Sequence, residues 1–176
     1  MVPFAAGGGT DILARLVATG MSARLGQPIV VDNRPGGNTG IAASAVARAK
    51  PDGYTLLLGN SSTYVVNTLL NVKTSYTPDE LAVLGMVANF PMVYVVANNS
   101  PIKSVDDLVA AAKKSPGQLA YASPGAGSPH HLGMESLKHR AGLEMVHVPY
   151  NGVSPAFPDI LAGRVAVMFT DYAAAT

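Results

Sequence analysis

The stretch "VPFAAGGGTDILARL", residues 2–16, joins a short apolar run to an amphipathic segment through three consecutive glycines, Gly7 to Gly9. Glycine is costly to order because it loses more backbone freedom on folding than any other residue. A glycine triplet at this junction therefore indicates a tight turn or a close approach of a ligand to the main chain. Strand, glycine-rich turn and helix together predict the first unit of an α/β fold.

The same order of elements continues along the chain and predicts mainly parallel sheets with right-handed crossovers. Apolar periodicity and stop signals predict helices over residues 10–25, 41–50, 61–70, 104–115, 132–140 and 155–162. Short β-branched or apolar runs predict strands over residues 28–33, 54–60, 81–87, 92–97, 119–122, 145–148 and 165–169. The composition changes around "ANNSPIKS", which places a lobe boundary near residues 98 to 101 and gives lobe one residues 1–98 and lobe two residues 99–176.

Composition excludes several classes of protein. Of the 176 residues, 48% are hydrophobic and 13% are charged, so the chain can form a sizeable core. The net charge of +1 comes from scattered residues, which argues against a nucleic-acid partner. There is no cysteine, which excludes disulfides, thiolate zinc sites and cysteine nucleophiles. No apolar run reaches the roughly 18 residues of a membrane span, and no motif indicates a cofactor.

Five loops that lead from a predicted strand into a helix share one chemistry. They are "FAAGGGTD", "GNSST", "SPGAGSPHH", "PYNGVS" and "FTD", and they consist mostly of glycine and neutral hydrogen-bond donors. Ligands of open α/β sheets bind at this edge, where helix N-termini favour anions. A phosphate would be expected to recruit a lysine or arginine, as in a P-loop, and neither "GGGTD" nor "GAGSPHH" contains one. The loops therefore predict binding of a carboxylate.

Two catalytic or metal-binding alternatives follow from the histidines. His130 and His131 are adjacent, so on a helix they point about 100° apart and do not share an ion. His139 and His147 lie on other parts of the chain without a metal-ligand spacing, so no metal site is expected. A Ser–His–Asp triad can be drawn from Ser123, His131 and Asp171, although "YASPGAGS" is not a nucleophile elbow. Asp11 has two open roles, as a helix cap or as a ligand contact.

Four segments together resemble the extracytoplasmic solute receptors of tripartite tricarboxylate transporters, the Bug or TctC-like binding proteins. They are "VPFAAGGGTDILARL", "VVDNRPGGNTGIAASAVARAKPDGYTLLLGN", "YASPGAGSPHHLGMESLKHRAG" and "MVHVPYNGVSPAFPDILAGRVAVMF", and they occur in family order. The resemblance implies a two-lobed, type II periplasmic binding protein that closes on a small organic acid. It also implies that membrane permease subunits are the partners of the full-length protein.

The resemblance carries functional positions onto this sequence. The glycine loop is matched through Pro3, Phe4, Gly7, Gly8 and Asp11, and it holds one carboxylate in the family. With the facing loops, the expected substrate-binding residues are Phe4, Ala5, Gly8, Gly9, Thr10, Asp11, Ser61, Ser62, Thr63, Ser123, Gly125, Gly127, Ser128, His131, Tyr150, Asn151, Gly152, Thr170 and Asp171. Two departures stand out. Pro129 replaces a small hydroxyl residue, and Thr170–Asp171 replaces an Asp–Asn pair, which leaves open which of the two points inward.

The chain is shorter than the roughly 300 residues of the family. Val2 and Pro3 already look like the end of a strand, and no signal peptide precedes them, so we interpret the sequence as a truncated receptor with an incomplete lobe one. The resemblance implies a periplasmic location, and strands left without partners favour self-association. Two alternatives to transport remain open. One is a serine hydrolase-like enzyme that uses Ser123 or Ser128 with a histidine, and the other is a carboxylate sensor for a two-component system.

Overall fold

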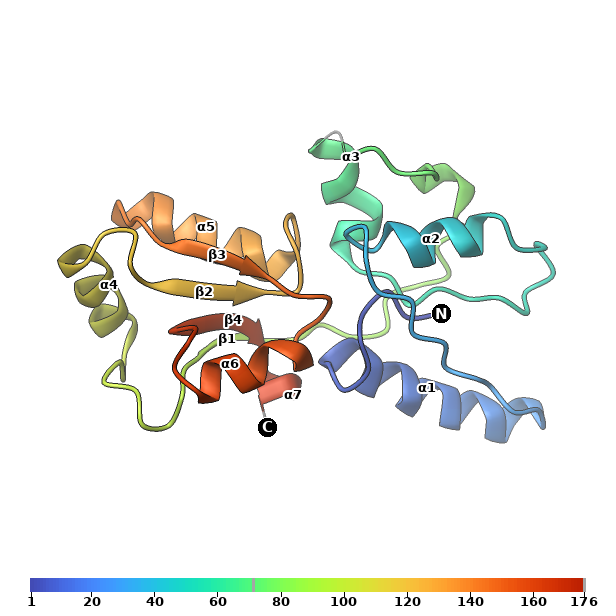
Figure 1. Ribbon diagram of the computed structural model, residues 1–176. Coiled ribbons are helices and arrows are strands. Elements are labelled where there is room, and N and C mark those ends of the chain that lie inside the picture. The colour runs from blue at the N-terminus through green and yellow to red at the C-terminus, as the bar shows by residue number, and fades with distance from the viewer. Residues whose placement is uncertain (71, 176) are drawn as a thin grey trace. The chain divides into compact units, whose positions relative to one another are not determined.

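The computed structural model describes residues 1–70 and 72–175 and divides into two compact units, Met1–Asn89 and Phe90–Thr176 (Figure 1). The division falls before strand β1 (Met92–Val95), whereas the sequence places the boundary near residues 98 to 101. β1 belongs to the second unit because it pairs antiparallel with β4 (Val167–Asp171) along its whole length. Residues 98 to 101 form the turn that leads to helix α4 (Val105–Lys114).

The first unit is built mainly from helices. These are α1 (Gly9–Leu25), α2 (Gly40–Ala47), the π-helical turn η1 (Ser62–Val66), α3 (Asn67–Leu69) and the 3-10 turn η2 (Pro78–Glu80). α1 ends as the sequence predicts, with Gly26 in the left-handed conformation at a φ of +66°. Its buried side consists of small residues such as Ala14 and Ala18, while Leu25 remains 62% exposed.

The strands predicted for residues 28–33, 54–60 and 81–87 are wrong for the described part of the chain. Two of the segments do flank the N-terminal residues. Val2 N donates to Asp32 O at 2.8 Å, and Leu58 N donates to Met1 O at 3.1 Å. Each contact stops at a single bridge or less. On the side of residues 56–58 the next donor would be Pro3, which has no N–H. Residues 81–87 are extended but exposed and have no pairing strand among the described residues.

The second unit contains a four-stranded mixed sheet in the order β1-β4-β2-β3. β2 (Ala120–Ser123) runs parallel to both β3 (Val146–Pro149) and β4, and the antiparallel β1 forms one edge. The helices are α4 (Val105–Lys114), α5 (Pro129–Ala141), the 3-10 turn η3 (Ser154–Ala156), α6 (Phe157–Leu161) and α7 (Tyr172–Ala175). The predicted α/β class with mainly parallel strands is confirmed here.

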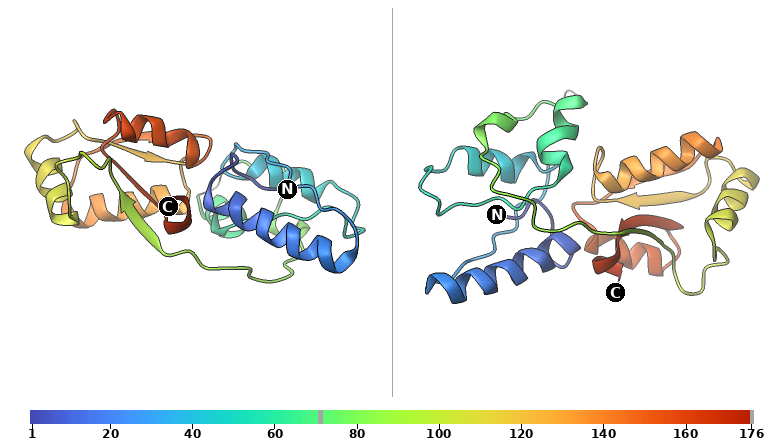
Figure 2. Two further views of the ribbon diagram at one scale, coloured as in Figure 1. Left: turned by 90° about the horizontal axis from the view of Figure 1, so that it is seen from below. Right: turned by 180° about the vertical axis from the view of Figure 1, so that it is seen from behind.

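Each face of this sheet carries its own apolar core. Alternate residues of the strands point to opposite faces, so Tyr121 and Val167 pack with Met134 of α5 and Leu108 of α4. The neighbouring Ala122 and Met168 pack on the other face, against a cluster that includes Ile160 of α6. α5 and α6 lie on opposite sides of the sheet in Figure 1 and in the view from behind in Figure 2. The sheet is thus fixed on both faces, which gives the loops at its edge a rigid base.

Within the described residues, no helix combines the length and the hydropathy that crossing a bilayer would require.

Candidate functional site

The glycine loop of the first unit turns directly into α1. Gly7 has a φ of +86°, a left-handed conformation that residues with a Cβ rarely adopt, and Gly8 is the N-cap of the helix. The N–H groups of Gly9 and Thr10 open the helix and have no hydrogen-bond partner within residues 1–70 and 72–175. Because they lie at the positive end of a 17-residue helix, these amides can bind an anion.

Asp11 holds this loop together from within. Its Oδ2 accepts hydrogen bonds from Gly7 N and from Arg15 Nε, both at 2.9 Å. Its Oδ1 accepts from Asn33 Nδ2 at 2.9 Å, and the same amide group donates to Phe4 O at 3.0 Å. Asp11 is 2% exposed. Its carboxylate therefore organises the loop. Gly8 and not Asp11 is the cap of α1, and contact of Asp11 with a ligand stays a prediction.

The pKa of Asp11 reflects these contacts. Burial alone would raise it, but the hydrogen bonds from Arg15, Gly7 and Asn33 outweigh burial and hold the pKa of this carboxyl below its ordinary value. The carboxylate is charged at neutral pH, and the adjacent Arg15 guanidinium compensates that charge. An incoming anion therefore meets amide dipoles rather than an uncompensated negative charge.

The second candidate loop of the first unit is largely internal. Ser62 and Thr63 are fully buried, Ser62 N donates to the Asn60 side chain at 2.9 Å, and Thr63 Oγ1 donates to Thr39 Oγ1 at 3.0 Å. Ser61 is exposed. Thr39 has a φ of +75°, which is unusual for a β-branched residue.

These loops leave the same end of the first unit. Met1 and Val2 hydrogen-bond on one side to residues 56–58 and on the other to residues 32–34, and the bridge to Asn33 is parallel. The chain then continues from the three segments into the glycine loop, the 35–39 turn and residues 59–63. The half-buried Ala5 and Thr10 and the exposed Ser61 are the predicted residues most accessible here.

In the second unit, the parallel register places the ends of β2, β3 and β4 at one edge of the sheet. Ser123 ends β2 and is fully buried. Its Oγ accepts from Gly125 N at 3.1 Å and lies 2.7 Å from His147 Nε2. Gly125 and Gly127 have φ values of +131° and +76°, which explains why glycines occupy this turn.

The loop after β2 ends in the cap of α5. Ser128 Oγ accepts from His131 N at 3.2 Å, and His131 Nδ1 accepts from Gly127 N at 3.2 Å. The N–H groups of Ala126 and His130 have no partner in the part of the chain that the structure describes. The edge therefore presents free amides, while Ser128 itself is fully buried as the cap.

His147 is the residue of this site that sequence analysis missed. The sequence placed it on a distant element, but the β2–β3 register sets it opposite Tyr121, and their rings stack with centroids 5.0 Å apart. The ring of His131 lies 4.2 Å from that of His147. The signal in the sequence is one of spacing. Tyr121 lies two residues before Ser123, and His147 lies two residues before Pro149. When the two strands pair in parallel with Ser123 opposite Pro149, Tyr121 and His147 become neighbours.

The loop after β3 is less available than predicted. Tyr150 N donates to Ser123 O at 2.8 Å, and its hydroxyl donates to Asp159, which also pairs with Arg164. Burial and the bond to Asp159 raise the pKa of Tyr150 to about 12. The phenol is thus neutral and engaged within its own unit. Asn151 is exposed and Gly152 is buried.

Thr170 and Asp171, at the end of β4, are both buried. Burial therefore does not distinguish which of the two points inward. Thr170 Oγ1 has no hydrogen-bond partner among the described residues. Asp171 Oδ1 accepts from Ala174 N at 3.0 Å, and Oδ2 lies 3.6 Å from His130 Nε2. The two residues occupy opposite faces of the sheet because strand side chains alternate.

The triad drawn from Ser123, His131 and Asp171 is not assembled. Ser123 pairs with His147, and Asp171 lies beside His130. Ser123 is also 0% exposed, so a substrate carbonyl has no access to its oxygen. The arrangement disfavours nucleophilic catalysis by this serine.

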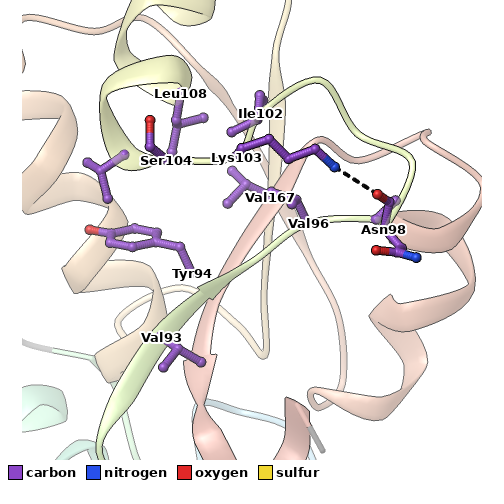
Figure 3. Close-up of a pocket in the computed structure, with 11 residues that line it drawn as sticks. Val93, Tyr94, Val96, Asn98, Ile102, Lys103, Ser104, Leu108 and Val167 are labelled. Atoms are coloured by element: carbon purple, nitrogen blue, oxygen red, sulfur yellow. Dashed lines mark hydrogen bonds between the residues drawn. The ribbon is translucent and has the colours of Figure 1, made fainter.

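One cavity of about 460 Å³ lies elsewhere in the second unit, between β1 and the start of α4 (Figure 3). It is lined by apolar side chains such as Val93, Ile102 and Leu108, and Lys103 Nζ closes one side by donating to Asn98 O at 2.9 Å. Val167 at the start of β4 also lines it, and so does Val93, which pairs with Thr170, so the cavity extends along β1.

Comparison with known proteins identifies the family that these loops belong to. Residues 13–176 match the model described as "Tripartite tricarboxylate transporter family receptor". A UPF0065 protein from the tcbD–tcbE intergenic region of Pseudomonas sp. strain P51 is 40% identical over 169 residues, which are 96% of this chain and 50% of that protein. Protein BugT of Bordetella pertussis is 39% identical over 94% of this chain and 52% of its own length. The chain thus spans about half the length of these relatives.

Solved structures agree with this assignment. Rpa4515 of R. palustris with adipate superposes with a TM-score of 0.89 at 35% identity, covering 99% of this chain and 59% of that one. MatC of Rhodopseudomonas palustris with bound malate gives a TM-score of 0.90 at 31% identity, with 99% and 60% coverage. The periplasmic binding protein BugD gives 0.82 at 30% identity, with 98% and 57% coverage. The predicted family and the predicted fold are both confirmed.

Proposed function

Because this chain belongs to the family of tripartite tricarboxylate transporter receptors, we propose that it captures a small organic carboxylate with uncharged hydrogen-bond donors. In the periplasm, the protein presents this carboxylate to membrane permease subunits for uptake. The loops after Met1–Val2 and after β2, β3 and β4 are the binding segments. No bond in the ligand is made or broken.

The observation that carries the proposal is the pair of unpartnered amides, Gly9 N and Thr10 N, in the first turn of α1. The negative charge of Asp11 in the same turn is compensated by Arg15. Desolvating a carboxylate costs several kcal/mol, and each hydrogen bond to a charged group contributes about 1.5–3 kcal/mol. Three to five neutral donors are therefore sufficient. The second unit has unpartnered amides of its own, at Ala126 and His130.

The related structures support a dicarboxylate as the first probe. Rpa4515 is described with adipate and MatC with malate, and both are more than 30% identical to this chain. Amide donors recognise the carboxylate group and not the chain that carries it. We therefore propose the ligand class, a small organic acid, rather than one acid.

A thermal-shift experiment tests the proposal. The protein is heated with adipate, with malate and with their uncharged dimethyl esters. A ligand at 100 times its dissociation constant stabilises the folded state by about 2.7 kcal/mol, so at least one acid should raise the melting temperature, and neither ester should. Equal shifts with acid and ester, or none with any organic acid of a wider panel, would contradict carboxylate capture.

A charge variant locates the binding segment. Ala6 is exposed in the glycine loop, so Ala6→Glu places a negative charge beside the free amides and should weaken binding of the acid. Ala6→Gln has the same size without the charge and is the matched control. Ala23→Glu adds the same charge at an exposed position near the other end of α1 and should leave the shift unchanged.

A further inference from the structure

The short segment 124–128, between β2 and α5, is held at both ends by imidazole rings. At its start, Ser123 Oγ lies 2.7 Å from His147 Nε2. At its end, Gly127 N donates to His131 Nδ1 at 3.2 Å. The rings themselves are neighbours, with centroids 4.2 Å apart. His131 of α5 and His147 of β3 thus each bind one end of segment 124–128, and the two rings lie against each other.

The two hydrogen bonds respond differently to a proton. A main-chain N–H can only donate, so the bond from Gly127 requires His131 Nδ1 to be unprotonated. The Ser123 hydroxyl can donate or accept, and it also has Gly125 O at 3.1 Å as an alternative acceptor. The contact between Ser123 and His147 therefore survives protonation of His147. The contact between Gly127 and His131 does not survive protonation of Nδ1.

The surroundings of the two rings favour their neutral forms. Burial lowers the pKa of both histidines, and for His147 the neighbouring His131 lowers it further. The charged groups that act on the rings are Glu135 and Lys138 of α5, which pair with each other at 2.6 Å. Tyr121 of β2 stacks on His147 and donates its hydroxyl hydrogen to Glu135. Glu135 raises the two pKa values and Lys138 lowers them, so the salt bridge leaves burial as the main influence.

We propose that His131 and His147 are positioning residues that hold segment 124–128 in its ligand-binding shape, and that protonation of His131 releases the segment. We call the hydrogen bonds of His131 and His147 to this segment the clamp. The consequence for ligand affinity rests on the proposed function, whereas the clamp itself does not. Because a single proton is taken up, the affinity for a carboxylate should fall by up to about tenfold per pH unit below the pKa of His131. A receptor of this kind releases its ligand more readily in acid.

Conservative variants separate the clamp from a general structural role. The side-chain oxygen of Asn occupies the place of Nδ1, so His131→Asn keeps an acceptor for Gly127 N but cannot be protonated. Gln likewise reproduces Nε2 in His147→Gln. His139→Asn changes an exposed histidine in the last turn of α5 and is the matched control.

The experiment measures the dissociation constants of adipate and malate by calorimetry from pH 7.5 to pH 4.5, because the pKa of His131 is lowered from its ordinary value. The wild type and the variants are compared at the same pH, so that titration of the acids themselves affects all of them equally. The wild type and His139→Asn should lose affinity together, while His131→Asn should lose only the part that titration of the acids themselves removes. An equal loss in His131→Asn would overturn the proposal.

A ligand-free readout distinguishes failure of the clamp from failure of the proposed function. Nitrogen-15 NMR at pH 7.5 should show His131 as the Nε2–H tautomer. The Gly127 amide should be protected from exchange at pH 7.5 and should lose that protection in acid, relative to the intrinsic exchange rate at each pH. A proton on Nδ1 at pH 7.5 would refute the clamp even if adipate binds. If neither acid binds while the tautomer is as expected, the proposed function fails and the clamp stands.

Discussion

Asn33 Nδ2 lies 2.9 Å from Asp11 Oδ1 although the two residues are 22 positions apart in the chain. The same amide donates to Phe4 O at 3.0 Å, so one side chain joins the end of the N-terminal segment to the first turn of α1. Asn33→Ala leaves two acceptors without this donor. It should lower the free energy of unfolding by about 1–3 kcal/mol. Urea denaturation measures this, with the exposed Asn99→Ala as control.

The stability contributed by Asp11 should depend on pH with a defined sign. The pKa of this carboxyl is lower in the folded protein than in the unfolded chain, whose value is about 3.9. Its contribution is therefore complete above that value and is lost as the pH falls through the lowered folded pKa. The difference in unfolding free energy between wild type and Asp11→Asn should be constant above about pH 5 and shrink in acid. A difference that grows on acidification would contradict the assigned contacts.

Two glycine-to-alanine substitutions should have opposite effects. A Cβ on Gly133 of α5 would lie 2.3 Å from Cε1 of Phe169, a ring of β4 that also packs on Tyr94. Gly133→Ala should destabilise the second unit by about 1–3 kcal/mol because the ring must move.

The matched control is Gly20→Ala in α1, where a Cβ meets no atom within 4 Å. It should stabilise the protein by up to about 1 kcal/mol through helix propensity. Thermal and urea denaturation measure both. Stabilisation by Gly133→Ala would show that α5 does not pack on β4 as described.

The first unit should associate with other copies of the chain. Val83, Leu84 and Met86 are 69%, 83% and 79% exposed in a segment without a pairing strand among the described residues. Such segments favour edge-to-edge pairing. Analytical ultracentrifugation should show a concentration-dependent sedimentation coefficient that Leu84→Lys reduces. A monomer at all concentrations would contradict this expectation.

The sequence predicts the second unit better than the first. Ser104 caps α4 through the N–H group of Asp107, because the local spacing of a cap is sufficient to recognise it. The cap of α5 was missed: the helix begins at Pro129 with Ser128 as its cap, three residues before the predicted start at residue 132. The runs at 28–33 and 54–60 have the composition of strands, but a strand needs a neighbour along its length. Here only Met1 and Val2 provide one.

The site shows the same limit. Neutral donors and glycine turns can be found by reading the loops, and they occur at the predicted edge. Whether a polar side chain is free depends on contacts distant in the sequence. Ser123 is occupied by His147, Asp11 by Asn33, and Tyr150 by Asp159. Periodicity does not reveal these pairings because they depend on register and packing.

Calorimetric titration of the protein at pH 7.5 with adipate, and in parallel with dimethyl adipate, tests the central claim most directly. We expect the diacid to bind and the diester to bind much more weakly or not at all, because amide donors at a helix N-terminus favour a negative charge on the ligand. Equal affinity for the two compounds would show that the apolar chain and not the carboxylate is recognised.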